Sequence, residues 1–209
     1  MLCDRDTLPS TDAHAIETAT SRRLRVLSRY HLENYFLDEN TIAKVFEPMT
    51  PEDAWQRAPE RIRSKLKDIA REQASYAAAL ATAANFREQV GNLDVMPSGP
   101  NGKTAVELGD MIWSIADEEV NRITNIVTRD KIDGFVADVM QKIELSLAGD
   151  SVAWKAIIPG KIIIRKFCGV AGLDYEFFRS AYINVADSMA VNPFAELISI
   201  FDEFDRFGT

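Results

Sequence analysis

Residues 1–6 read MLCDRD and residues 24–37 read LRVLSRYHLENYFL, and these two stretches decide the fold that we expect. Each starts with an apolar or alternating run, which is typical of a short β-strand, and then continues into polar side chains. In an α/β sheet the functional groups lie just beyond the carboxyl ends of the strands, where Asp4 and Asp6 fall. We therefore expect an α/β corner at the N-terminus, with its chemistry at the strand ends.

Asp4 and Asp6 are the candidate metal ligands. Side chains two residues apart on an extended segment point to the same side, so both carboxylates can face one cation. Oxygen ligands suit a hard ion such as Mg²⁺, which one or two carboxylates hold together with waters and substrate phosphates. The alternative is a solvated turn after the strand, and an Asp-x-Asp triplet taken alone favours that alternative.

The second stretch adds His31 and Glu33, which follow its strand pattern. In the structural interpretation Glu33 is an exposed carboxylate on a short helix over residues 30–37, and His31 is a capping or packing residue. In the functional interpretation Glu33 lies beside Asp4 and Asp6 as a third acid. The residues by themselves leave both interpretations open.

Taken together, an apolar strand, Asp-Arg-Asp, a loop, a second strand and Tyr-His-Leu-Glu-Asn-Tyr-Phe-Leu resemble the DUF4435 family. Residues 157–161, Ile-Ile-Pro-Gly-Lys, resemble a Pro-Gly-Lys segment in the C-terminal helical part of that family. The family has a Toprim-type domain akin to that of the OLD-family nucleases, found beside or fused to ABC/AAA-type ATPases in bacterial anti-phage systems.

The resemblance implies a metal-dependent nuclease that hydrolyses phosphodiester bonds of DNA or RNA and works with an ATPase encoded nearby. Asp4, Asp6 and Glu33 are then the catalytic residues, and Asp4 and Asp6 bind Mg²⁺ or Mn²⁺. His31 and Lys161 become candidates for contacting the substrate or supporting the site. For Lys161, capping of a loop is the alternative that the sequence favours. A homodimer is a further expectation.

The chain departs from the family pattern at its start. A Toprim domain carries an acidic residue, usually Glu, on an earlier strand, whereas this chain begins three residues before Asp4. We therefore expect a partial Toprim-like segment over residues 1–48, followed by a helical domain over residues 49–209. The alternative function is a non-catalytic protein-interaction module, or a truncated remnant of such a nuclease.

Composition narrows the class of protein. The 209 residues are 46% apolar, enough for a real core in one or two domains. A formal net charge of −8 argues against general affinity for nucleic acid or anionic membranes. The chain has no apolar run of membrane-spanning length and no secretory signal pattern. Cys3, on a predicted buried strand, and Cys168, in an apolar helix, give no disulfide framework, which favours a reducing cytoplasm.

Most of the remaining chain has helical periodicity, so the fold that we predict is α-rich overall. Residues 106–115 fit a helix or a strand-like insertion, and residues 161–165 fit a short strand as well as a helix. The loop over residues 93–104 ends in Gly-Lys-Thr, but its glycine spacing excludes a phosphate-binding loop. The helices are predicted over residues 41–47, 51–90 with a break near Pro59, 117–127, 131–147, 162–171, 175–189 and 194–207.

Overall fold

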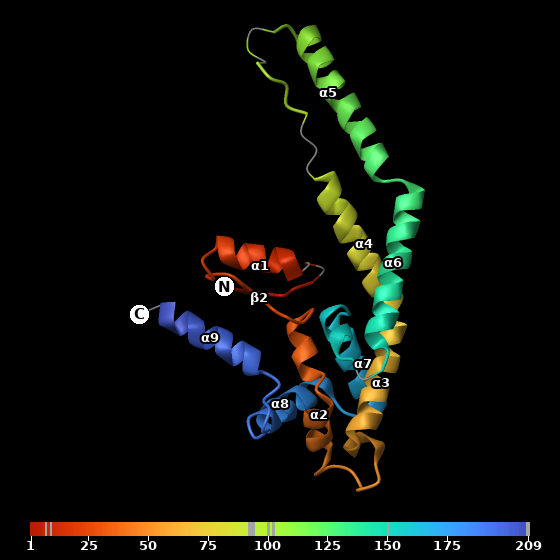
Figure 1. Ribbon diagram of the computed structural model, residues 1–209, viewed down its shortest axis with the longest axis vertical. Helices are drawn as coiled ribbons and strands as arrows, with labels where there is room; N and C mark the ends of the chain where they lie inside the picture. Colours follow the sequence, from red (N-terminus) through yellow and green to blue (C-terminus); the bar gives the residue numbers. More distant parts are fainter. Residues whose placement is uncertain are drawn as a thin grey trace. The chain divides into compact units, whose positions relative to one another are not determined.

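The computed structural model describes residues 1–6, 8, 10–91, 95–99, 101, 103–149 and 151–207. Over these residues the chain is mostly helical, with a single small parallel sheet of two strands, as Figure 1 shows. The prediction of a helix-rich fold is therefore confirmed. The chain divides into two compact units, one made of Met1–Ala77 with Lys142–Thr209 and the other of Ala78–Gln141. The boundary predicted between residues 48 and 49 lies inside the first unit.

The sheet is much shorter than the sequence indicates. Strand β1 (Leu2–Cys3) pairs in parallel with β2 (Arg25–Val26), and helix α1 (Ser10–Ala19) lies between them in the chain. The alternating run that starts residues 24–37 was expected to form a longer strand, but only Arg25 and Val26 do so, and Arg22 just before them has a φ of 61°, in the left-handed region that no strand adopts. Cys3 is half-buried, so the prediction that it lies on a buried strand is wrong. The Toprim-like corner stays a prediction.

Besides the sheet, the first unit contains short helices that begin at capping residues or prolines. Helix α2 begins two residues before the predicted start at residue 41, because the Asp38 carboxylate caps it by accepting a hydrogen bond from Thr41 N at 2.9 Å. A helix from residue 51 was predicted wrongly, since α3 begins only at Pro59, a proline suited to the first turn. The elements here are the 3₁₀ helix η1 (Leu32–Phe36), α2 (Glu39–Phe46), η2 (Trp55–Arg57) and α3 (Pro59–Glu72).

The C-terminal elements complete the first unit. Helix α7 ends where predicted, because Gly172 takes a φ of 73° that a glycine adopts without strain. The strand alternative for residues 161–165 is excluded, since those residues lie inside α7. The elements are η3 (Ala153–Ala156), α7 (Gly160–Ala171), α8 (Tyr175–Ala186) and α9 (Ala195–Phe207).

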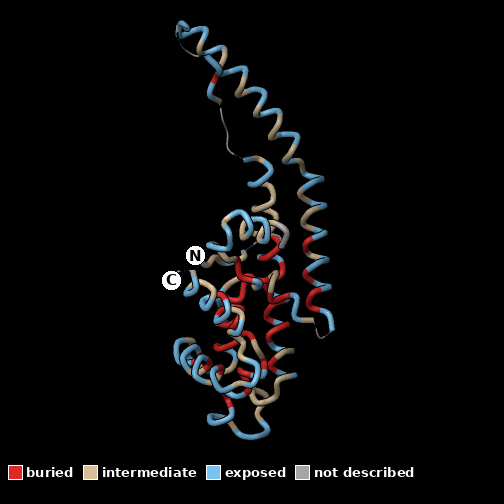
Figure 2. The backbone as a smooth tube through the Cα atoms, turned by 60° about the vertical axis from the view of Figure 1, so that its left-hand side comes forward, coloured by how far each residue is buried: buried red, intermediate tan, exposed pale blue. Residues whose placement is uncertain are grey.

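The core of the first unit lies among α2, α3, α7 and α8. Helix α2 contacts α3 and α8, and α3 contacts α7, so apolar faces from both ends of the chain meet. Figure 2 shows the buried residues gathered in this part of the molecule. The Tyr182 hydroxyl, fully buried, donates to the carbonyl of Tyr35 at 2.9 Å and ties α8 to η1. Fully buried members include Leu37, Ile42, Ile62, Leu66, Ile163, Phe167 and Phe178.

The second unit is purely helical over its described residues. It takes most of α4 (Ala74–Val90), all of α5 (Ala105–Ile126) and most of α6 (Arg129–Leu147). Two predicted segments, 106–115 and 117–127, form the single helix α5, which opens on a capping box between Thr104 and Glu107. Arg122 donates to the carbonyl of Val90 at 2.7 Å and so ties α5 to the end of α4.

Candidate functional site

The parallel pairing of β1 and β2 brings the predicted carboxylates next to the second stretch. Asp4 follows β1 directly, and its Oδ1 accepts a hydrogen bond from the backbone N–H of Leu32 at 3.0 Å. The Asp6 carboxylate lies 2.9 Å from His31 Nε2, and the N–H of Asp6 donates to the carbonyl of Tyr30 at 3.0 Å. Asp6 and His31 are therefore in direct contact, and Asp4 is bonded to the backbone of the next residue, Leu32; we call Asp4, Asp6 and His31 the strand-end cluster.

The backbone of this cluster differs from the extended run that we expected. Asp6 has a φ of 46°, a left-handed conformation that Asp tolerates better than most residues. The argument that Asp4 and Asp6 point to the same side requires an extended backbone through both, so it does not apply. Arg5 fixes the turn, because its Nη1 donates to the carbonyl of Ser28 at 3.0 Å.

His31 lies at the centre of the strand-end cluster. Its Nδ1 is buried without a hydrogen-bond partner in the described part of the chain, while its ring packs edge-on against Tyr30. Its backbone N–H donates to Asn34 Oδ1 at 3.0 Å, at the start of η1. His31 thus combines the capping position that the structural interpretation gave it with a direct contact to a predicted metal ligand.

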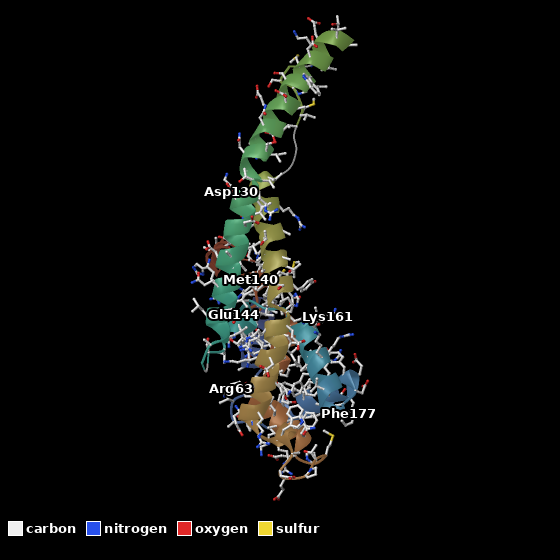
Figure 3. All side chains as sticks on the ribbon, turned by 90° about the vertical axis from the view of Figure 1, so that its right-hand side faces the viewer. Arg63, Asp130, Met140, Glu144, Lys161 and Phe177 are labelled. Carbon is white, nitrogen blue, oxygen red and sulfur yellow. The ribbon has the colours of Figure 1, made fainter. Side chains whose placement is uncertain are left out.

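Glu33 and Lys161 are placed differently. Glu33 is half-buried in η1. Burial, and after it the Glu33 charge, raises the pKa of the Tyr175 hydroxyl at the start of α8. Lys161 is exposed in the first turn of α7, where Figure 3 labels it. Among the described residues, no group of three or more His, Cys, Asp or Glu side chains is placed to hold a metal ion. The described side chains therefore do not by themselves supply the ligands of a metal centre.

A buried asparagine joins the two motifs that carry the family resemblance. Asn34 is fully buried, and its Oδ1 accepts from the N–H of Gly160 at 2.9 Å. Its Nδ2 donates to the carbonyls of Lys155 and Ile158, both at 2.9 Å. A Cβ on Gly160 would lie 2.5 Å from Asn34 Oδ1, so only glycine fits there. No role was predicted for Asn34; the available signal was a polar residue directly before the apolar run Tyr35-Phe36-Leu37.

A second feature that the sequence analysis missed is a buried ion pair beside this segment. Glu39 Oε2 lies 3.2 Å from Lys155 Nζ, and Glu39 Oε1 lies 2.7 Å from the Arg63 guanidinium. Burial lowers the pKa of Lys155, and the Glu39 charge opposes that shift only partly. Burial acts to raise the pKa of Glu39, but the Lys155 charge and the hydrogen bonds outweigh it, so this pKa is lowered.

Comparison with protein-family models, with curated proteins and with solved structures found no match to this chain. Searching the described residues for a helix with the length and apolar character of a membrane span also found none.

Proposed function

We propose that the chain is a non-catalytic protein-interaction module whose binding element is helix α5. The observation that carries this proposal is that none of the 22 residues of α5 is buried, although the helix is rich in large apolar side chains. Trp113 is 73% exposed, and Val106 and Val120 are 74% and 58% exposed. Figure 2 shows the whole helix as exposed or half-buried.

These exposures are unusual for a helix that serves only its own unit. Helices obtain most of their stability from packing an apolar face, and single exposed apolar residues are normal on any surface. An exposed tryptophan with exposed valines on the same helix instead favours a binding surface, because contiguous exposed apolar side chains mark interaction sites and tryptophan is enriched among the residues that dominate binding energy. This pattern supports a role in binding another protein.

A paired substitution tests the proposal. Affinity capture with the full chain is expected to retain a partner, and Trp113→Ser/Val120→Asn is expected to lose it. The matched control is Val170→Asn, which changes a similarly exposed valine on α7. Loss of the partner in the first variant alone supports the proposal, whereas equal retention by both variants contradicts it.

The second candidate function is the metal-dependent nuclease of an anti-phage system, acting with an ABC/AAA-type ATPase on DNA or RNA. The observation that favours it is the strand-end cluster beyond β1, in which Asp6 contacts His31 and Asp4 bonds to the backbone of Leu32. The test is cutting of DNA and RNA by the purified chain with and without Mg²⁺ or Mn²⁺. Cutting that needs the metal and is lost in Asp4→Asn/Asp6→Asn would favour the nuclease over the interaction module.

A further inference from the structure

Apart from Ile112, which is 37% exposed, the exposed large apolar residues of α5 and its C-terminal end follow a seven-residue spacing. They are Val106, Trp113, Val120 and Val127, the last being the residue that ends the helix, and we call them the α5 seam. On an α-helix a seven-residue step drifts by only about 20°, so the four side chains stay on one side. This spacing is the signature of a helix that packs along a second helix.

The residues that lie between the members of the seam suit a close helix neighbour. Gly109, Ala116 and Ile123 each follow a seam residue by three positions, which completes the alternation of three and four residues in a coiled-coil repeat. A Cβ placed on Gly109 would meet no atom within 4 Å, so the surface beside it is open. The small residues Gly109 and Ala116 allow a second helix axis to come near, and Ile123 adds apolar contact area.

The seam is not the face that α5 uses within its own unit. The half-buried residues Leu108, Met111 and Ile115 lie on the opposite side of the helix, given about 100° of rotation per residue. Arg122 also lies on that opposite side, and it holds the carbonyl of Val90. The four seam residues therefore stay exposed, whereas Ala116 and Ile123 at the edge of the seam are half-buried like the opposite side.

The negative charge of α5 indicates which kind of molecule can bind along the seam. Four exposed acids lie along α5, and the fifth acid, Glu119, bonds to Arg122, the only basic residue of the helix. This acidity opposes nucleic acid and anionic lipid. A second copy would bring acidic flank to acidic flank, in a chain that carries a net charge of −8. The four exposed acids are Glu107, Asp110, Asp117 and Glu118.

We propose that the α5 seam docks an amphipathic helix of a partner protein, whose apolar residues are flanked by Lys and Arg. This inference rests on the proposed function and names the chemistry of the partner. The apolar seam supplies the contact area, and the acidic flank selects a basic partner and repels an acidic one.

The probe is a labelled synthetic helical peptide of about three heptads, with Leu at the apolar positions and Lys at the flanking ones. A matched peptide carries Glu in place of Lys. Fluorescence anisotropy with the full chain is expected to show binding of the Lys peptide and at least about tenfold weaker binding of the Glu peptide. Added salt is expected to narrow this difference, because the flanking charges are exposed.

Two variants and one control locate the peptide. Trp113→Ser/Val120→Asn is expected to weaken binding of the Lys peptide by at least about tenfold, while Val170→Asn leaves it unchanged. Asp110→Asn/Asp117→Asn keeps the apolar seam and is expected to reduce the preference for Lys over Glu. Circular dichroism checks that each variant is folded, and the asparagine pair tests the proposal even if the first variant is not.

Four results would overturn the inference. The first three are the absence of peptide binding, equal binding of both peptides, and binding that Trp113→Ser/Val120→Asn does not weaken. The fourth is self-association in sedimentation velocity that Trp113→Ser/Val120→Asn abolishes. The last result assigns the seam to a second copy. If the peptide fails while affinity capture still depends on Trp113 and Val120, only the partner chemistry is wrong. If affinity capture of the partner does not depend on Trp113 and Val120, the proposed function itself is wrong.

Discussion

At the scale of single residues, one buried contact decides how the first unit holds together. Asn34 satisfies the N–H of Gly160 and two carbonyls, so residues far apart in the sequence share one amide side chain. Spacing in the sequence did not reveal this contact, because a tertiary partner leaves no periodic pattern. The strand-end acids were recognised from their place after a strand, yet the turn at Asp6 was missed.

Gly160→Ala tests this contact. The new Cβ would lie 2.5 Å from Asn34 Oδ1 and 2.8 Å from its backbone N, so we expect the free energy of unfolding to fall by about 1–3 kcal/mol. The matched control is Gly169→Ala on the same helix, where a Cβ meets nothing within 4 Å. There alanine is expected to stabilise by roughly 0.5–1 kcal/mol, since glycine is a poor helix former. Urea unfolding measures both, and equal effects would contradict the contact.

Glu39→Gln tests the buried ion pair. The substitution leaves the Lys155 ammonium buried beside a neutral partner, so we expect a loss of about 3–5 kcal/mol at neutral pH. Glu47→Gln, in the exposed pair with Lys44, is the control and should change stability by less than about 1 kcal/mol. Urea unfolding of the three proteins gives the comparison, and a small effect at Glu39 would argue against the pair.

The same ion pair makes the stability of the folded chain depend on pH. The pKa of Glu39 in the folded chain lies below its ordinary value of 4.5, so its stabilising effect is complete above pH 4.5. That effect is lost as the pH falls through the folded pKa, when the carboxylate gains a proton. The free energy of unfolding should therefore fall more steeply with decreasing pH for the natural chain than for Glu39→Gln. Parallel curves would show that Glu39 ionises alike in both states.

At the scale of elements, most helices could be predicted, whereas the strands were found in the expected stretches but with the wrong length. Caps and periodicity are local, so the Asp38 cap, the Asp174 cap and the Gly172 stop all follow from neighbouring residues. Strand β2 is shorter than predicted because Ser21 and Arg22, just before it, have positive φ values. Neither residue type predicts a positive φ. The break between α3 and α4 at Gln73 was also missed, because the apolar pattern runs through it.

The cap of α8 gives the prediction at this scale. Asp174 accepts a hydrogen bond from Phe177 N at 2.9 Å, so Asp174→Ala is expected to cost about 1 kcal/mol. Asp187→Ala, at the other end of α8, is the control. Removing a carboxylate from a helix C-terminus is neutral or slightly stabilising, because that end carries partial negative charge. Thermal unfolding distinguishes the two, and an equal loss in both variants would contradict the capping role.

At the scale of the whole molecule, burial is divided unevenly between the units. Helices α3 and α7 carry several fully buried residues, whereas α5 carries none. Because local opening is easiest where few apolar contacts must break, the amides of residues 105–126 should exchange with deuterium much faster than those of residues 160–171.

The same measurement connects this uneven burial to function. If an amphipathic helix covers the α5 seam, the Lys-flanked peptide is expected to slow exchange across residues 105–126 and to leave residues 160–171 unchanged. The Glu-flanked peptide is the control and should have little effect on either segment. Protection confined to α7 would place the peptide outside α5. Slow exchange in α5 without any peptide would mean that the helix is stable without a partner and would contradict this prediction.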